Sequence, residues 1–308
     1  MEFMIPGLIL GFAASRGRFC LNSGFADAAF KADFRKVNIL LVAVLIQSVF
    51  AVIYVFHGSI PALAPLNLLV LAVGGFLFGM VMPVSGGCPG GIMFKATEGQ
   101  LPAISALTGF LLAMGVFYAT PVAAQLESLH GYYAVGDVRI VGTGIFIWSA
   151  IAFVLLAYLL FFVKDARPEG AKWSWKQAGM AIGAAAVIYS SLSLMRPGAA
   201  PLGFMPGFIS AWNLRLAPEV WFVGAAFAGA TVAAVTKGGF SFQHAPFSVY
   251  LKRLVGGFFL GAAASLAAGC NVGYGLTFLP YLSLHALIAM TAIFLGRITS
   301  EKIKRRFS

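Results

Sequence analysis

Apolar residues along the chain gather in nine long runs, and the short stretches between them carry most of the charged residues. A helix of about 20 apolar residues spans the hydrocarbon core of a bilayer. The pattern therefore predicts an all-α polytopic membrane protein with about nine transmembrane helices. The first and the eighth are short, and the nine lie near residues 3–16, 38–56, 68–83, 101–118, 143–163, 177–195, 219–236, 254–268 and 281–297.

Composition supports this class. Of the 308 residues, 60% are hydrophobic and 10% are charged, a balance that a soluble domain does not tolerate on its surface. The net charge of +11 comes from Lys and Arg interspersed among the apolar runs rather than from a basic arm, so we expect no nucleic-acid partner. The first run has no charged segment before it and no small-residue cleavage site after it, so we expect it to stay in the mature protein.

The distribution of basic residues predicts the orientation. With the N-terminus outside, all but three of the 21 Lys and Arg residues fall on or near the cytoplasmic face, as the positive-inside rule requires. The exceptions are Arg139, Arg196 and Arg215. We therefore predict a multi-pass protein of the bacterial inner membrane with a cytoplasmic C-terminus. The inner set comprises Arg16, Arg18, Lys31, Arg35, Lys36, Lys95, the 164–176 loop, Lys237, Lys252, Arg253 and the tail from Arg297 to Arg306.

Two glycine-rich segments are related to each other. "VGGFLFGMVMPVSGGCPGG", residues 73–91, aligns without a gap with "VGGFFLGAAASLAAGCNVG", residues 255–273, so that Cys88 falls on Cys270. The helix before Cys88 is the third span and that before Cys270 is the eighth, so the two copies run in opposite directions. "GLILG" from Gly7 and "GMAIG" from Gly179 give a fainter match five spans apart.

These matches predict an inverted internal repeat of four spans, one linker span and four spans. Residues 1–308 would form a single transport domain, with a first repeat over 1–118, a linker helix over 143–163 and a second repeat over 177–297. Inverted repeats built around broken helices are typical of transporters, whose sites lie near the bilayer midplane where the halves meet.

Each of the three cysteines lies just after a predicted break between helical segments. Their odd number excludes a complete disulfide framework, and no zinc-type spacing accompanies them, so we expect neither a metal site nor a cofactor. Each lies at the start of a short segment after a break: "GRFCLNSGF", "SGGCPGGIMF" and "AAGCNVGYGLTF". Exposed backbone at membrane depth is tolerated only where it is buried in protein or lines a cavity. We therefore predict short re-entrant half-helices around a path that contains Cys20, Cys88 and Cys270.

The surroundings of the cysteines favour an anionic substrate. Helix N-termini attract anions, and Arg16, Arg18 and Lys95 carry the complementary charge. The candidate groups that hold the substrate are Asn22, Ser23, Ser85, Gly86, Gly87, Gly90, Gly91, Gly269, Asn271 and Gly273.

Those groups can hold the oxygens of an anion without a thiol beside them, so the presence of the cysteines needs its own explanation. A thiol is a weak donor and a soft partner, which suits the terminal sulfur of an ion such as thiosulfate better than it suits sulfate. A thiolate would repel an incoming dianion, so we expect neutral thiols that contact the substrate in turn. Weak contacts also let the ion leave.

The three cysteine motifs resemble those of the YeeE/YedE family of membrane proteins, and the likeness covers nearly the whole chain. Characterised members take up thiosulfate, and other relatives are associated with selenium compounds. The resemblance implies a fold pinched at its middle in which three cysteines pass thiosulfate along by S–H···S contacts, roles that fall on Cys20, Cys88 and Cys270. A second-half counterpart of Cys20 would fall near Leu192. The family works with small cytoplasmic sulfur carriers resembling TusA, which would here be a separate chain.

Alternatives remain open at the level of sequence. The protein could transport another sulfur or selenium compound, or act as a membrane sulfurtransferase that forms a cysteine persulfide. No general base lies near any cysteine, since His285 falls about four turns into the helix after Cys270, so we expect no enzyme. A passive channel or a membrane anchor for a soluble partner is the third class. No nucleotide-binding motif such as GxxxxGK[ST] is present.

Overall fold

The computed structural model describes residues 2–57, 64–140, 143–196, 200–236 and 240–306, and within them the chain is all helical. Lys237, one of the predicted inner cations, lies outside the described residues. The helices of the first half are α1 (Met4–Gly17), α2 (Leu21–Lys31), α3 (Arg35–Phe56), α4 (Leu68–Ser85), α5 (Pro89–Thr97) and α6 (Leu101–Ala119). They are followed by α7 (Val122–Gly131) and α8 (Thr143–Phe161).

The second half contains α9 (Trp175–Met195), α10 (Phe204–Trp212), α11 (Pro218–Thr236), α12 (Phe247–Leu266), α13 (Asn271–Gly273) and α14 (Leu284–Arg306). A π-helical turn over Tyr274–Phe278 and a 3-10 turn over Leu279–Tyr281 join α13 to α14.

Seven helical segments of the described chain are long and apolar enough to cross a membrane, namely α3, α4 together with α5, α6, α8, α9, α11 and α12. The other two predicted spans form α1, which has only 14 residues, and α14, which has a basic end. They pack along α11 and α4 respectively. The expectation of a short eighth span was wrong, because α12 begins at Phe247 and has 20 residues.

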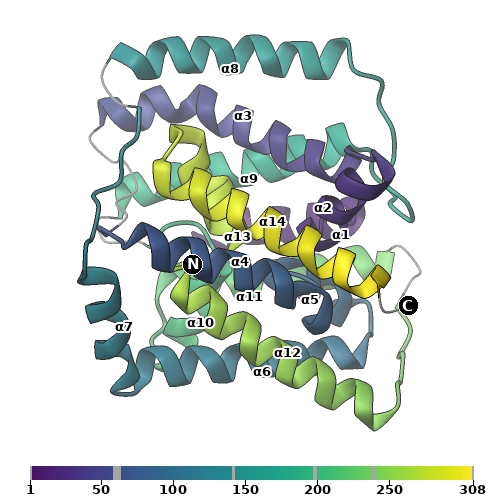
Figure 1. Cartoon of the computed structure of the whole chain (residues 1–308). Coiled ribbons are helices and arrows are strands. Elements are labelled where there is room, and N and C mark those ends of the chain that lie inside the picture. The colour runs from purple at the N-terminus through teal and green to yellow at the C-terminus, as the bar shows by residue number, and fades with distance from the viewer. Residues whose placement is uncertain (1, 58–63, 141–142, 197–199, 237–239, 307–308) are drawn as a thin grey trace.

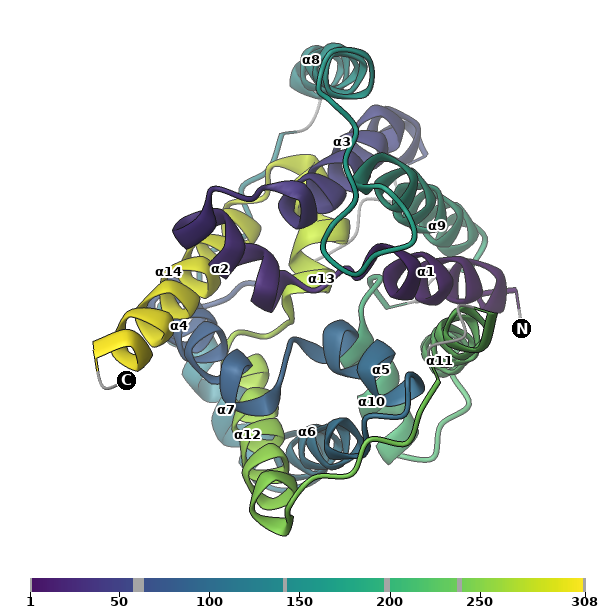
Figure 2. The ribbon, with the colours of Figure 1, turned by 90° about the vertical axis from the view of Figure 1, so that its right-hand side faces the viewer.

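The long helices approach each other closely. A Cβ atom at Gly11 of α1 would overlap the carbonyl oxygen of Ala226 in α11, and one at Gly79 of α4 would overlap that of Ile293 in α14. Helices in lipid associate through such small-residue contacts, because no hydrophobic effect drives them together. Seen along the bundle, the long helices surround the shorter α5 and α13 (Figure 2).

The order of long and short helices in α1–α6 recurs in α9–α14. The packing partners recur too, because α1 packs on α11 as α9 packs on α3, and α6 packs on α12 as α14 packs on α4. Two repeats would give such an order, and both the division into repeats and their inverted orientation stay predictions. Between them, α8 stands at the edge of the bundle with most of its apolar side chains exposed (Figure 1), as expected for a helix that faces lipid.

Candidate functional site: three thiols between two cavities

Each cysteine is the residue that caps the N-terminus of a short helix. Cys20 precedes α2, Cys88 precedes α5 and Cys270 precedes α13. The chain breaks before each one at a residue with positive φ, which is Arg18 at 50°, Gly86 at 97° and Ala268 at 51°. These left-handed residues end the preceding helices. The predicted start of a short segment at each cysteine is therefore confirmed.

A fourth short helix, α10, completes the set. Its capping residue is Gly203, which holds in the second half the place that Cys20 holds in the first. The predicted counterpart, Leu192, lies inside α9. The prediction was wrong because α9 is seven residues longer than α1, 21 against 14, so an alignment counted from the helix start falls short of the break. Pro201, Gly203, Pro206 and Gly207 were the overlooked signal of a broken segment.

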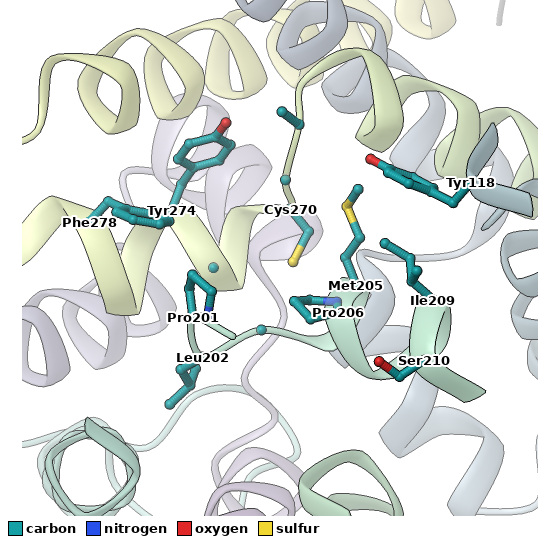
Figure 3. A pocket seen from close by; sticks show the side chains of 14 residues that line it. Tyr118, Pro201, Leu202, Met205, Pro206, Ile209, Ser210, Cys270, Tyr274 and Phe278 are labelled. Atoms are coloured by element: carbon teal, nitrogen blue, oxygen red, sulfur yellow. The ribbon is translucent and has the colours of Figure 1, made fainter. Parts of the chain in front are cut away.

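Cys270 lines a cavity of about 350 Å³, the Cys270 cavity. Figure 3 shows its thiol and the Met205 side chain, with Tyr118 and Tyr274 on either side. Among the described residues, the lining contains no charged side chain; it consists of Tyr118, Pro201, Leu202, Gly203, Met205, Pro206, Ile209, Ser210, Ala268, Gly269, Cys270, Gly273, Tyr274 and Phe278. An anion here would meet hydroxyl, thiol and backbone groups, together with the N-terminus of α10.

Cys20 lines a second cavity of about 370 Å³, the Cys20 cavity. Its lining is charged and consists of Arg18, Cys20, Ser23, Lys36, Phe94, Lys95, Glu169 and Gly170. The two cavities lie toward opposite ends of the bundle. Tyr118 stands at the end of α6 that leads into the chain before α8, whereas Gly170 lies in the chain after α8 (Figure 1).

Cys88 lies close to Cys20 and to Asn271, the residue after Cys270, beside a small space that we call the constriction. The space beside it measures only about 10 Å³ and is lined by Leu10, Ala14, Phe19, Cys88, Gly90, Phe204, Val272 and Leu276. The thiol of Cys20 lies close to that of Cys88. A Cβ at Gly91 would overlap the Sγ atom of Cys20 and lie 3.5 Å from that of Cys88. Glycine is therefore required where the two thiols meet.

Most of the predicted binding residues line one of these three spaces or lie beside one of the thiols. Gly269 and Gly273 line the Cys270 cavity, Gly90 lines the constriction and Ser23 lines the Cys20 cavity. Gly87 lies against Cys20, since a Cβ there would come within 3.5 Å of its Sγ atom.

Asn271 and Asn22 each leave polar atoms unused. The Asn271 side chain is fully buried near Cys88, yet neither atom of its amide group has a hydrogen-bond partner within the described residues. An amide left without partners is costly in a protein interior, so Asn271 is suited to binding a transient ligand. Asn22 also has an unpartnered Oδ1 atom, but it lines none of the three spaces around the thiols.

Ser85 and Gly86 lie elsewhere. They line a separate cavity of about 160 Å³ with Arg253, His244 and Lys95. The Ser85 hydroxyl donates to backbone oxygens, among them that of Gly87 at 3.0 Å, so it helps to form the break before Cys88.

Of the three predicted cations, two reach the Cys20 cavity. Arg18 pairs with the buried Glu98 at 3.4 Å, and the Lys95 ammonium donates to the carbonyl of Gly86. Arg16 instead donates to the hydroxyl of Thr236 at 2.8 Å, stands over the ring of Phe12 and does not line the cavity.

Sequence reasoning missed a further cation, Lys36, because it lies on α3, far from any cysteine in sequence. Its ammonium pairs with Asp27 of α2 at 2.7 Å. Nearby, the Arg35 guanidinium holds the pKa of Asp33 below its usual value by hydrogen bonding to the carboxylate. The pair of Lys36 and Asp27 thus fastens α2, which Cys20 caps, to α3.

Comparison with known proteins gives a consistent result. A family model described as sulphur transport matches residues 16–299. The chain is 28% identical to the thiosulfate transporter TsuA of Spirochaeta thermophila, with 96% of each chain covered. It is 26% identical to the thiosulfate transporter TsuA of Escherichia coli, with 97% of this chain and 92% of that protein covered.

Proposed function

Because the chain belongs to the sulphur transport family of membrane proteins, we propose that it takes up thiosulfate through a path in which Cys270, Cys88 and Cys20 contact the substrate sulfur in turn. The observation that carries the proposal is the placement of the thiols. One lies in each of two cavities at opposite ends of the bundle, and the third lies near Cys20 and Asn271 beside a small space of about 10 Å³. Both TsuA relatives are thiosulfate transporters.

The two cavities suit successive stages of passage. In the Cys270 cavity, the ion loses water among tyrosines, a thioether and a thiol, and helix dipoles supply partial positive charge. At Cys88 the sulfur end leads, because a polarizable atom fits a space bounded by one thiol and two phenylalanines. Lys95, Arg18 and Lys36 then attract the ion into the Cys20 cavity. Each contact is weak enough for release.

Purified protein in liposomes should accumulate ³⁵S-labelled thiosulfate when the lumen is thiosulfate-free, and it should not accumulate sulfate. The expected selectivity follows from the uncharged Cys270 cavity, where a hard, strongly hydrated oxyanion loses its water without compensation. Equal uptake of both ions would contradict the role of soft contacts. Preferred uptake of a selenium compound would assign the protein to that substrate class instead.

The same proposal fixes an orientation with the Cys270 cavity outside. A cysteine placed at the exposed Ser128 of α7 should react with an impermeant thiol reagent in intact cells, and one at Lys172 should react only after permeabilisation. The native thiols are buried and give a low background. Labelling of position 172 in intact cells would reverse the orientation.

A separate cytoplasmic TusA-like carrier would receive sulfur on the side of the Cys20 cavity in a bacterial inner membrane. The sulfurtransferase alternative lacks a histidine base beside the thiols, because no histidine of the described chain lines either thiol cavity. His285 instead bonds to the buried Asp137 through Nδ1 at 2.9 Å. A persulfide trapped on Cys20 or Cys270 after exposure to thiosulfate would favour that alternative.

A further inference from the structure

Arg297 is a buried cation that none of the stages above uses. It lies on α14 at the start of the basic tail, yet only 6% of its surface is exposed. Burying a guanidinium costs several kcal/mol unless its donors are satisfied by well-placed partners. Intramembrane or deeply buried charges in transporters therefore mark functional positions.

The hydrogen bonds of Arg297 lead toward Cys20. Its Nε donates to the carbonyl oxygen of Asn22 at 3.1 Å, and its Nη2 donates to Glu301 at 2.9 Å. Asn22 lies in the first turn of α2, two residues after Cys20. The third nitrogen, Nη1, has no partner among the described residues. The one bond from Arg297 to another helix is thus made to the end of α2 that carries the thiol.

On the other side of the Arg297 side chain, the backbone of α14 is packed tightly on α4. A Cβ at Gly79 of α4 would lie 2.8 Å from the backbone nitrogen of Arg297, and one at Gly296 of α14 would overlap the carbonyl oxygen of Phe76 in α4. Such backbone contact leaves the two helices little freedom to slide. Because α4 leads through Gly86 to Cys88, Arg297 joins the half-helix of Cys20 to the element that places Cys88.

We propose that Arg297 is a positioning residue that holds the Cys20 thiol beside Cys88. This positioning role deepens the proposed function. Only its expected effect on transport rests on that function. Arg297 is not the sole contact between α2 and α14, since the rings of Phe25 and Phe294 lie 5.3 Å apart edge to face. Loss of the guanidinium should therefore free the first turn of α2 while the helix stays docked.

The test compares Arg297→Met with Lys302→Met, which removes the same charge from an exposed position of the same helix. In each protein, mass spectrometry measures the rates at which Cys20 and Cys270 are alkylated by N-ethylmaleimide. We expect Arg297→Met to speed the reaction of Cys20 by about three- to tenfold, the effect of one lost hydrogen bond on a local opening. Cys270 and the Lys302→Met protein should react at wild-type rates, and Arg297→Lys should be intermediate.

Transport provides the second readout. The KM for thiosulfate should rise in Arg297→Met, with partial recovery in Arg297→Lys. The proposal is overturned if Cys20 reacts at the wild-type rate in a folded Arg297→Met or Arg297→Lys protein. It is also overturned if Cys270 is accelerated as much as Cys20, because that would indicate a general loosening of the fold. A wild-type protein that fails to take up thiosulfate, but whose Cys20 responds as expected, would refute the proposed function and leave the positioning role intact.

Discussion

Thiosulfate uptake is expected to fall to background in a Cys88→Ala variant. The space beside Cys88 measures only about 10 Å³, so in the proposed path the ion passes in direct contact with this thiol. Each ~1.4 kcal/mol added to the barrier slows passage tenfold, and a lost contact at the narrowest point acts fully on that barrier. Initial rates of ³⁵S-thiosulfate uptake by liposomes measure the effect.

Serine is the matched control for this position. The Cys88 Sγ accepts a hydrogen bond from the backbone nitrogen of Gly91 at 3.4 Å and so caps α5. Alanine loses this cap, whose removal typically costs about 1 kcal/mol, whereas serine keeps it. We expect Cys88→Ser to melt like the wild type and to transport poorly. Wild-type uptake by Cys88→Ser would show that hydrogen bonding suffices, and wild-type uptake by Cys88→Ala would refute the path.

Gly91→Ala should abolish uptake although it adds only a methyl group. The new Cβ would occupy the place of the Cys20 Sγ atom, so the thiol or α5 itself must shift and the contact between Cys20 and Cys88 is lost. Alanine is otherwise favoured over glycine in a helix by about 1 kcal/mol. The expected result is thus a folded protein that does not transport, measured by uptake together with thermal melting.

Gly224→Ala is the control for the backbone effect. Gly224 lies on the exposed face of α11, and a Cβ there would meet no atom within 4 Å. This variant should transport at the wild-type rate and be slightly more stable. If Gly91→Ala behaves in the same way, the close approach of the two thiols is not needed for transport.

Local sequence sufficed to locate the three breaks that precede the cysteines. Gly86 ends α4 with a left-handed backbone conformation, which glycine adopts without strain. Pro89 begins α5 at the first helical position, where the fixed φ of proline already suits the helix. The same signals around Gly203 were present but were assigned no break, because the repeat alignment pointed to Leu192. A difference in helix length between the halves cannot be recognised from an alignment that allows no gap.

The composition of each cavity could not be deduced in this way. Tyr118 and Met205 meet Cys270 from helices separated by long stretches of chain, and Lys36 reaches the Cys20 cavity from α3. Arg297 was counted with the basic tail near the cytoplasmic face, and nothing in the sequence indicated that the packing of α14 on α4 would bury it. Each of these placements depends on how helices pack rather than on the residues beside it in sequence.

The sequence by itself determined the membrane class, the apolar helices and the half-helices headed by cysteines. Transfer of apolar side chains into lipid and the φ preferences of Gly and Pro act over a few neighbouring residues, so they can be read along the chain. Only the tertiary structure decided that Cys20 and Cys88 lie close together, that both thiols approach Gly91 and that Arg297 reaches Asn22. Those contacts join separate helices, and their distances are set by the close packing of the whole bundle. The conformational preferences of neighbouring residues carry no information about that packing.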